Sequence, residues 1–293
     1  MKVIGHRGAR GLLPESSLPG FAKAIDLKVD MIELDVGITK DETVVVHHDF
    51  TLNPEFTRDG TGNWIETNTI RICDLAYEEL LQYDIGMIKP GSDYQNQFPH
   101  QKSRTECSIP TLEEVVSLVD ATGQNIIFCI EAKYLPKNPL PTHPLDKFSE
   151  VLADEIIRLD IATTSIIQSF DWQIAQAIQK LVPRLDAWHL TSQMPSYNTL
   201  DESLDGRLTQ GMRLPDFGGS VPKMVAAAGG DVWSCDVQTL TAELIDEAHE
   251  LGLKVYCWTV NSETDFQRLY AAGIDGIITD YPDRLINFLE MQE

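Results

Sequence analysis

The sequence predicts a (β/α)8 TIM barrel, formed as a single domain of residues 1–293 with a small inserted cap at residues 53–108. Short apolar runs alternate with segments of helical periodicity, and the alternation is repeated eight times, the number expected for this barrel. The apolar fraction of 43% is sufficient for a large core. A doubly wound open sheet is the second choice, because no G-x-G-x-x-G follows the first apolar run.

The predicted elements follow in order along the chain. The strands are the apolar runs at residues 3–6, 31–36, 126–131, 165–169, 186–190, 232–236, 255–259 and 276–279. The helices are the periodic segments at residues 18–28, 112–121, 145–159, 173–182, 242–251 and 263–272. Thr111 and Thr241 each precede acidic residues, as N-caps do, and Gly252 and Gly273 stand where C-terminal caps belong.

One further β-prone run, residues 43–47, interrupts the alternation. Only about six residues separate it from the strand at 31–36, and a parallel crossover needs about a dozen, so the two runs are expected to form an antiparallel hairpin. A two-residue loop at Asp41 and Glu42 would place His48 directly opposite Asp35 and turn His47 away. A loop of odd length or a bulge would reverse this assignment.

Residues 53–108 fit none of the barrel elements. They contain two glycine-rich turns, a polar run at residues 93–106 and one short helical pattern at residues 75–83. Because a structureless loop of this length is uncommon inside a compact domain, we expect an inserted cap at the C-terminal mouth of the barrel.

Two carboxylates end the second predicted strand. Residues two apart in a strand share a face, so Glu33 and Asp35 project together while Leu34 points to the helix layer. Paired carboxylates at a barrel mouth are costly unless a cation or hydrogen-bond donors compensate them. The pair therefore indicates either a metal site or one salt-bridged and one solvated acid.

A second pair, Glu131 and Lys133, ends the strand at residues 126–131. Glu131 either completes an oxygen-ligand set with Glu33 and Asp35, leaving Lys133 to contact an anion, or forms an internal ion pair with Lys133. Taken alone, the spacing favours the ion pair.

The first strand ends in His6, Arg7 and Gly8 at the same barrel mouth. The planar guanidinium of Arg7 suits two phosphate oxygens, and the glycine permits close backbone approach. His6 and His48, placed on either side of a metal-bound phosphate, are the kind of pair that donates and accepts protons near neutral pH. A lone histidine at a strand end is more often structural, but so many polar groups at one barrel end predict a catalytic site.

The overall charge narrows the classes of partner. The formal net charge is −22, and such a field repels nucleic acid and anionic lipid surfaces, so no nucleic-acid partner is expected.

No apolar run approaches the ~20 residues of a membrane span, so no stable membrane insertion is expected. The first residues do not form a secretory segment, which favours a cytoplasmic protein or a periplasmic chain already trimmed. The five scattered cysteines favour neither a disulfide framework nor a zinc ribbon.

Taken together in order, these motifs resemble the glycerophosphodiester phosphodiesterase family, within the phospholipase-C-like barrel phosphodiesterases. The matching segments are His6-Arg7-Gly8-Ala9, Pro14-Glu15, Ile32-Glu33-Leu34-Asp35-Val36, Val44-Val45-Val46-His47-His48-Asp49, Thr51-Leu52, Gly60-Thr61-Gly62, Ile109-Pro110-Thr111-Leu112-Glu113-Glu114-Val115, Ile130-Glu131-Ala132-Lys133, Gln168-Ser169-Phe170, Trp258-Thr259-Val260-Asn261 and Asp275-Gly276-Ile277-Ile278-Thr279-Asp280-Tyr281-Pro282. The resemblance spans essentially the whole chain.

The resemblance implies a distorted barrel and a hydrolase that releases sn-glycerol 3-phosphate and an alcohol from a small-molecule glycerophosphodiester. The roles that it implies are a divalent cation, Ca²⁺ or Mg²⁺, on Glu33, Asp35 and Glu131, an acid/base pair at His6 and His48, phosphate contacts at Arg7 and Lys133, and a substrate-side aromatic at Trp258. The attacking group is either the 2-hydroxyl of the substrate's glycerol or a water molecule.

The chain departs from the family pattern at a few positions. Ser16 and Ser17 replace the usual Asn-Thr after Pro-Glu, and Glu42 stands where the family often has glycine in the hairpin turn. None of these changes removes an expected ligand or catalyst.

Two alternative functions remain open. The same machinery could act on a bulkier lipid, as a lysophospholipase D or a phosphoinositide-type diesterase, although no basic amphipathic helix is evident. A barrel retained only to bind a phosphate ligand would be expected to lack a histidine or carboxylate, and none is missing here.

Overall fold

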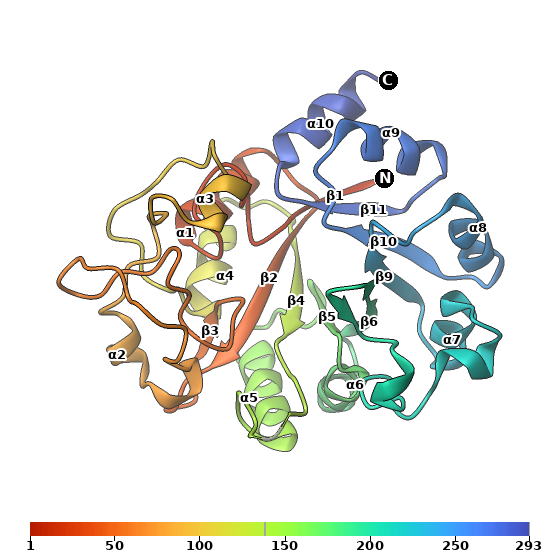
Figure 1. Cartoon of the computed structure of the whole chain (residues 1–293), viewed down its shortest axis with the longest axis horizontal. Coiled ribbons are helices and arrows are strands. Elements are labelled where there is room, and N and C mark those ends of the chain that lie inside the picture. Colours follow the sequence, from red (N-terminus) through yellow and green to blue (C-terminus); the bar gives the residue numbers. More distant parts are fainter. Residues whose placement is uncertain (138, 293) are drawn as a thin grey trace.

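The computed structural model describes residues 1–137 and 139–292 and has eight parallel strands that close into a barrel. Neighbours in the sheet follow the order β1-β11-β10-β9-β6-β5-β4-β2, and a pairing of β1 with β2 closes the ring. Helices surround the strands, as Figure 1 shows. The (β/α)8 barrel predicted from the alternation is confirmed.

The barrel strands begin and end within two residues of the predicted runs. They are β1 (Lys2–Gly5), β2 (Met31–Ile38), β4 (Ile127–Ala132), β5 (Ser165–Ser169), β6 (Asp186–Thr191), β9 (Val232–Asp236), β10 (Lys254–Trp258) and β11 (Gly276–Thr279). Two short strands outside the barrel, β7 (Gln193–Met194) and β8 (Tyr197–Asn198), form a hairpin that was not predicted.

Each barrel strand is accompanied by a helix. These helices are α1 (Leu18–Asp26), α4 (Leu112–Asp120), α5 (Leu145–Arg158), α6 (Trp172–Leu181), α7 (Val221–Ala227), α8 (Ala242–Glu250), α9 (Glu263–Ala271) and α10 (Pro282–Glu290). The expected caps Thr111 and Thr241 accept hydrogen bonds from the amides of Glu114 and Leu244. Helices α7 and α10 were not predicted, although each has a proline in its first turn, a start signal.

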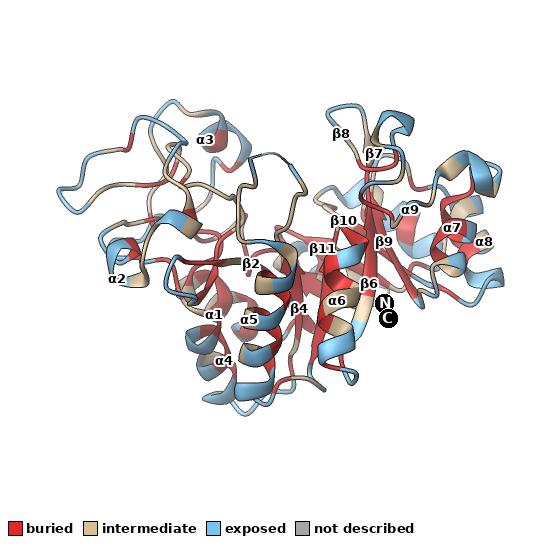
Figure 2. Ribbon diagram, turned by 90° about the horizontal axis from the view of Figure 1, so that it is seen from below, coloured by how far each residue is buried: buried red, intermediate tan, exposed pale blue. Residues whose placement is uncertain are grey.

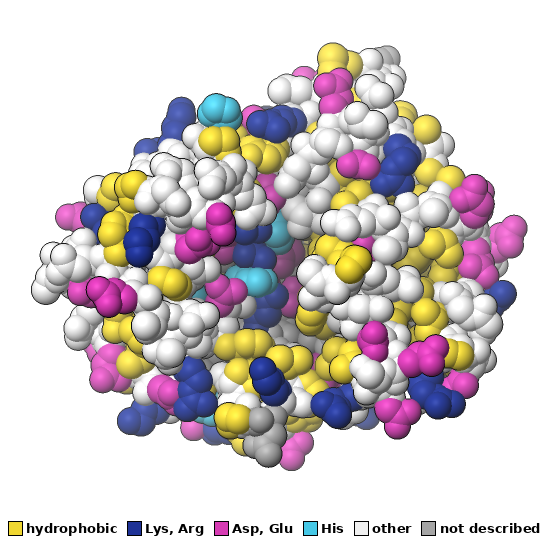
Figure 3. All heavy atoms as spheres, viewed as in Figure 1, with side chains coloured by type: hydrophobic (Ala, Val, Ile, Leu, Met, Phe, Trp, Pro, Cys, Tyr) yellow, Lys and Arg dark blue, Asp and Glu magenta, His cyan; other side chains and the backbone are white. Residues whose placement is uncertain are grey.

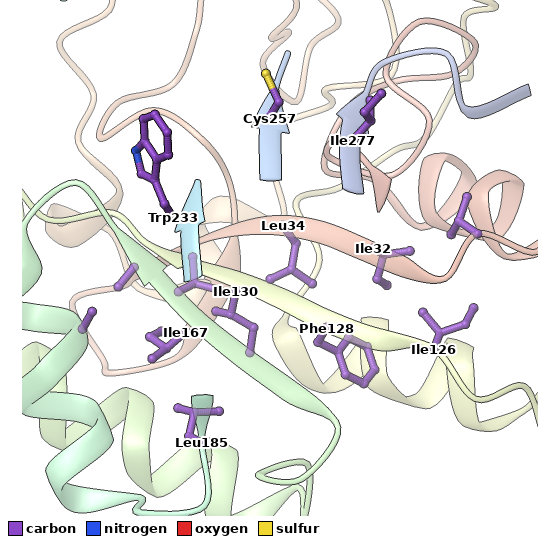
Figure 4. Close-up of a cluster of buried hydrophobic side chains, with 14 of the residues drawn as sticks. Ile32, Leu34, Ile126, Phe128, Ile130, Ile167, Leu185, Trp233, Cys257 and Ile277 are labelled. Atoms are coloured by element: carbon purple, nitrogen blue, oxygen red, sulfur yellow. The ribbon is translucent and has the colours of Figure 1, made fainter. Parts of the chain in front are cut away.

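The alternation of side chains along the strands separates two apolar layers. The apolar cluster inside the barrel takes one buried residue from each strand, namely Ile4, Met31, Cys129, Ile166, Trp188, Val232, Tyr256 and Ile278. Residues of the other parity, including Leu34, Ile130 and Ile167, pack against the helices (Figure 4). Since strand side chains alternate, Glu33 and Asp35 share the inward face of Met31, and Glu131 shares that of Cys129.

Strand β3 (Val44–Val46) pairs antiparallel with β2, which confirms the predicted hairpin but not its register. Val36 faces Val46 and Ile38 faces Val44, so the two-residue loop that placed His48 opposite Asp35 is wrong. The connection is longer by one residue, and Glu42 adopts a φ of 68° within it. This left-handed conformation, which suits glycine better than other residues, accounts for the glycine that the family often has there.

Residues 53–108 contribute no strand to the barrel. Their short helices α2 (Tyr77–Leu80) and α3 (Asp93–Gln97), with η1 (Ile72–Asp74), pack around a separate apolar cluster that includes Phe56, Leu80 and Phe98. In Figure 2 this segment and the β7–β8 hairpin rise at the same end of the barrel. Its interpretation as an inserted cap stays a prediction. Among the described residues, no helix combines the length and apolar character needed to cross a membrane.

Candidate active site

Three inward carboxylates meet where β2 and β4 end. Asp35 is the register partner of Glu131 on the neighbouring strand, and Glu33 lies two residues earlier on the same face. One oxygen from each carboxylate lies within 4.8 Å of the other two. Two oxygens bound to one Ca²⁺ are at most about 5 Å apart, twice a Ca–O distance of about 2.4 Å, so the cluster has the dimensions of a divalent cation site.

The pKa values of Glu33 and Glu131 indicate that neighbouring side chains compensate the negative charge of the cluster only in part. Burial, followed by the charges of Asp35 and Glu131, raises the pKa of Glu33 well above its usual value. Burial also raises the pKa of Glu131 to about 7, against the opposing effect of Lys133. For Asp35, Lys133, His48 and Arg7 outweigh burial and hold the pKa far below its usual value. A buried acid cluster of this kind fits an oxygen-seeking cation.

Two basic side chains, those of Lys133 and Arg7, contact these carboxylates. Lys133 Nζ lies 2.6 Å from Glu131 Oε1 and 2.9 Å from Asp35 Oδ1, so the Glu–Lys ion pair considered from the sequence is present. Arg7 Nε lies 3.2 Å from Asp35 Oδ2, and the Arg7 amide donates to Glu33 Oε2 at 3.0 Å. Asp35 Oδ2 nevertheless has no hydrogen bond of good geometry among the described residues. The ion pair and a ligand set are therefore compatible.

His6 is held from behind by a carboxylate. Its Nδ1 lies 2.6 Å from Asp280 Oδ1, while Asn261 donates to Asp280 Oδ2 at 2.7 Å. Burial would raise the pKa of Asp280, but His6 and Arg10 outweigh it and keep this pKa below its usual value. Because an ionised carboxylate only accepts, the proton of neutral His6 is on Nδ1. Its Nε2 is directed at the carboxylate cluster, 3.9 Å from Glu33 Oε2.

His48 is held in the same way by Asp49. Its Nδ1 lies 2.6 Å from Asp49 Oδ1, and Asn53 donates to Asp49 Oδ2 at 3.0 Å. Burial, with the charges of Arg7 and Lys133, lowers the pKa of His48 to about 4, so the ring is neutral at pH 7 with Nε2 unprotonated. His47 instead is buried next to Phe56 with its Nε2 3.2 Å from the carbonyl oxygen of Thr51.

The predicted site residues other than Asp35 line one hollow. His6, Arg7, Glu33, His48, Glu131, Lys133 and Trp258 line a cavity of about 130 Å³. This cavity adjoins a wider one of about 880 Å³, since both are lined by His48, Glu131, Lys133, Phe170 and Trp258. Figure 3 shows histidine, basic and acidic side chains together in a depression at the centre of this face.

Trp258 lies on an aromatic wall of the wider cavity. Its ring packs edge-on against Phe170 at 5.4 Å between centroids, and Phe170 packs likewise against Tyr197 of the β7–β8 hairpin at 5.1 Å. The tryptophan therefore contributes an aromatic surface to the cavity wall, and its buried indole Nε1 is a donor without a partner among the described residues.

Several site residues were not assigned from the sequence. Asp280 lies two residues beyond the inward Ile278, so the parity that identified Asp35 could have identified it. Asp49 directly follows His48, but adjacency in a sequence does not show a side-chain contact. Glu15 was left out of the site, yet it contacts Arg7 Nη1 at 2.8 Å, a long-range arrangement that strand periodicity cannot predict.

Comparisons with known proteins agree on one family. The family model for the glycerophosphoryl diester phosphodiesterase family matches residues 6–284. A glycerophosphodiester phosphodiesterase of Caldanaerobacter subterraneus subsp. tengcongensis is 28% identical over 298 residues, covering 98% of this chain and 97% of the relative.

Solved structures show the same fold. A protein of Silicibacter pomeroyi, provisionally described as a glycerophosphoryl diester phosphodiesterase, is 32% identical with a TM-score of 0.88, covering 100% of this chain and 94% of its own. An Oleispira antarctica phosphodiesterase, solved in complex with the product sn-glycerol-3-phosphate, is 20% identical with a TM-score of 0.72, covering 99% and 97%. The chain described here belongs to the glycerophosphoryl diester phosphodiesterase family and is an enzyme of that class, a phosphoric diester hydrolase.

Proposed function

We propose that this enzyme hydrolyses glycerophosphodiesters to sn-glycerol 3-phosphate and an alcohol, that it requires a divalent cation, and that His6 and His48 are its acid/base pair. One observation carries the proposal. Two histidines, each hydrogen-bonded at Nδ1 to an aspartate, line one cavity together with the basic side chains of Arg7 and Lys133. Beside them lies a carboxylate cluster that has the dimensions of a metal site. The product bound by the Oleispira relative supports a small-molecule substrate.

Glu33, Asp35 and Glu131 would hold the cation, and their oxygen ligands suit Ca²⁺ or Mg²⁺. When bound, the cation supplies Lewis acidity, which polarises the phosphoryl group and lowers the pKa of an attacking hydroxyl. The remaining chemistry belongs to side chains of the chain itself.

Proton transfer falls to the two histidines. One accepts the proton of the attacking hydroxyl or water at Nε2, and the other, protonated at Nε2 in the substrate complex, donates to the leaving alkoxide. Where the attacking group is the substrate's 2-hydroxyl, a water molecule then opens the resulting cyclic phosphate with the two histidine roles exchanged, and sn-glycerol 3-phosphate is released. Asp49 and Asp280 stabilise the imidazolium that forms in each case. Arg7 and Lys133 stabilise charge on the equatorial phosphoryl oxygens. The contacts of Arg7 with Glu15 and Asp35 use Nη1 and Nε, so Nη2 is not engaged by either.

Asp280→Asn is expected to lower kcat roughly 10- to 100-fold, because the His6 ring loses its charged anchor. It is also expected to lower the pKa of His6 further, since the charge of Asp280 raises that pKa against the effect of burial. An NMR titration of His6 and the steady-state rate on glycerophosphocholine measure both effects.

The matched control is Asp275→Asn. Asp275 contacts His249 Nε2 at 2.9 Å in a partly exposed pair outside the cavity. This variant is expected to keep wild-type kcat and the wild-type pKa of His6. Equal rates for the two variants would contradict the anchoring role of Asp280.

The wider cavity supports a second candidate function. Its walls include Phe50, Leu135, Phe170, Tyr197 and Trp258, and its volume of about 880 Å³ exceeds that of a choline or ethanolamine substituent. A lysophospholipid could place its acyl chain there, and the enzyme would then act as a lysophospholipase D.

A substrate panel separates the two candidates. We expect release of sn-glycerol 3-phosphate from glycerophosphocholine and glycerophosphoethanolamine, with kcat/KM higher than for choline release from lysophosphatidylcholine. The reverse order would favour the lysophospholipase D. Absence of turnover on all three substrates with Ca²⁺ or Mg²⁺ present would contradict both.

A further inference from the structure

A buried network behind the cavity centres on Glu15. Glu15 Oε1 accepts from Arg7 Nη1 at 2.8 Å. Glu15 Oε2 lies 2.7 Å from Arg10 Nε and accepts from Tyr94 Oη at 2.5 Å. Burial would raise the pKa of Glu15, but Arg10 and Arg7 outweigh it and lower this pKa to about 2. Both oxygens of an ionised carboxylate are thus occupied by the chain's own donors.

Tyr94 comes from helix α3 in the segment 53–108, far in sequence from the other members. Its ring packs against Phe56 and Phe98 with centroids 5.0 and 4.9 Å away, and the Arg10 guanidinium lies over the Phe98 ring at 4.5 Å. Burial and the neighbouring Glu15 raise the pKa of Tyr94, so the phenol stays protonated and can only donate to Glu15. The hydroxyl is therefore fixed in position and in role.

Arg7 lies between two acceptors. Glu15 binds its Nη1 on one side, and Asp35 lies 3.2 Å from its Nε on the other. Asp35 belongs to the carboxylate cluster, so an arginine released by Glu15 would move towards that cluster, where it would compete with a cation and leave the phosphate position. The contact with Glu15 therefore holds Arg7 away from the carboxylate cluster.

We infer that Tyr94 is a positioning residue, through which the segment 53–108 holds Glu15 and thereby keeps Arg7 oriented towards the substrate phosphate. The inference rests on the proposed function, since it takes Arg7 to be a phosphate ligand. It gives residues 53–108 a part in substrate binding that does not require them to touch the substrate.

A second tyrosine of the same segment provides the matched control. Tyr77 Oη donates to Glu114 Oε2 at 3.1 Å and to the carbonyl oxygen of Ile109 at 3.4 Å. It therefore fastens the segment to the start of α4, and it is not among the described residues that line either cavity. Tyr77→Phe and Tyr94→Phe each remove one hydroxyl and keep the ring.

The test compares these variants in the full chain with Ca²⁺ or Mg²⁺ bound. Tyr94→Phe is expected to weaken competitive inhibition by sn-glycerol 3-phosphate roughly 10-fold and to raise KM more than it lowers kcat, because a displaced arginine loses its phosphate contact. Tyr77→Phe, which also removes a hydroxyl that fastens the segment, is expected to leave the inhibition constant unchanged.

A double-mutant cycle identifies the path of the effect. In an Arg7→Lys background, Tyr94→Phe is expected to add no further loss of inhibitor affinity, since the group that it positions is gone. Wild-type affinity in Tyr94→Phe, equal losses in both tyrosine variants, or the full loss retained without Arg7 would overturn the inference. A wild-type enzyme that neither binds sn-glycerol 3-phosphate nor releases it would instead refute the proposed function.

Discussion

His48→Gln is expected to lower kcat on glycerophosphocholine by roughly 10²–10⁴ while leaving the fold intact, because it removes one of the two groups that we propose to transfer protons. The side chain is partly exposed at the cavity and its only hydrogen bond among the described residues is to Asp49. Little packing is lost with it. Steady-state kinetics, together with circular dichroism to verify the fold, measure the effect.

The adjacent residue is the control. His47 is buried, and its ring contacts Phe56 and the carbonyl oxygen of Thr51 away from the cavity. His47→Gln is therefore expected to lower Tm and to change kcat little once the protein is folded. Loss of turnover in His47→Gln with near-normal turnover in His48→Gln would contradict the assignment of His48.

Asp35→Asn is expected to abolish stabilisation of the fold by divalent cations and to lower kcat by roughly 10² or more, since a bound cation contributes several kcal/mol to such a transition state. Asp35 is the member of the cluster whose charge is best maintained, because Lys133, His48 and Arg7 lower its pKa against burial. The difference in Tm between protein in EDTA and protein in excess CaCl₂ or MgCl₂ measures the loss. Asp41→Asn, in the exposed hairpin turn, is the control and is expected to keep that difference.

The pH dependence of the same Tm difference follows from Glu131. Without a cation, burial raises its pKa from 4.5 to about 7, so its protonated form stabilises the fold below the unfolded pKa and that contribution is lost as pH rises through the folded pKa. A cation binds the deprotonated form. The cation-induced rise in Tm is therefore expected to grow between about pH 5 and about pH 8. A rise in Tm that is independent of pH, or that survives in Asp35→Asn, would contradict the ligand assignment.

The barrel could be predicted because its strands carry a local signal. Runs such as residues 126–131 are apolar on both faces, as expected for parallel strands covered by helices, and they match the observed strands closely. Helix α7 has seven residues and the strands of the β7–β8 hairpin have two each, so they are too short to show a clear periodic pattern in the sequence.

The orientation of His48 illustrates where local rules fail. The hairpin register that placed it beside Asp35 is off by one residue, and strict alternation in the observed register would turn His47 inward instead. β3 ends at Val46, where the amide donates to the carbonyl oxygen of Pro110. The His47 amide still donates to the carbonyl oxygen of Asp35 at 2.9 Å, but neither His47 nor His48 belongs to a strand. The alternation therefore does not fix the direction of His48, which lines the cavity.

The candidate site residues that lie on strands could be predicted from the sequence. The residues that hold those side chains in place could not. The shared inward direction of Glu33, Asp35 and Glu131 follows from the period of two in β2 and β4. The role of Glu131 as a ligand was indicated only by the family resemblance, since the spacing alone favoured its ion pair with Lys133. Their pairing with Arg7, and the anchoring of Arg7 by Glu15 and Tyr94, join segments that are remote in sequence. Ser16 has a φ of 51°, so the asparagine that the family usually has there suits this backbone better than serine does.

The most direct test of the account is the formation of sn-glycerol 3-phosphate from glycerophosphocholine by one enzyme preparation, first in excess EDTA and then after addition of Ca²⁺ or Mg²⁺. We predict that chelation abolishes product formation and that one of these cations restores it. Undiminished formation of sn-glycerol 3-phosphate in excess EDTA would contradict a catalytic cation on Glu33, Asp35 and Glu131.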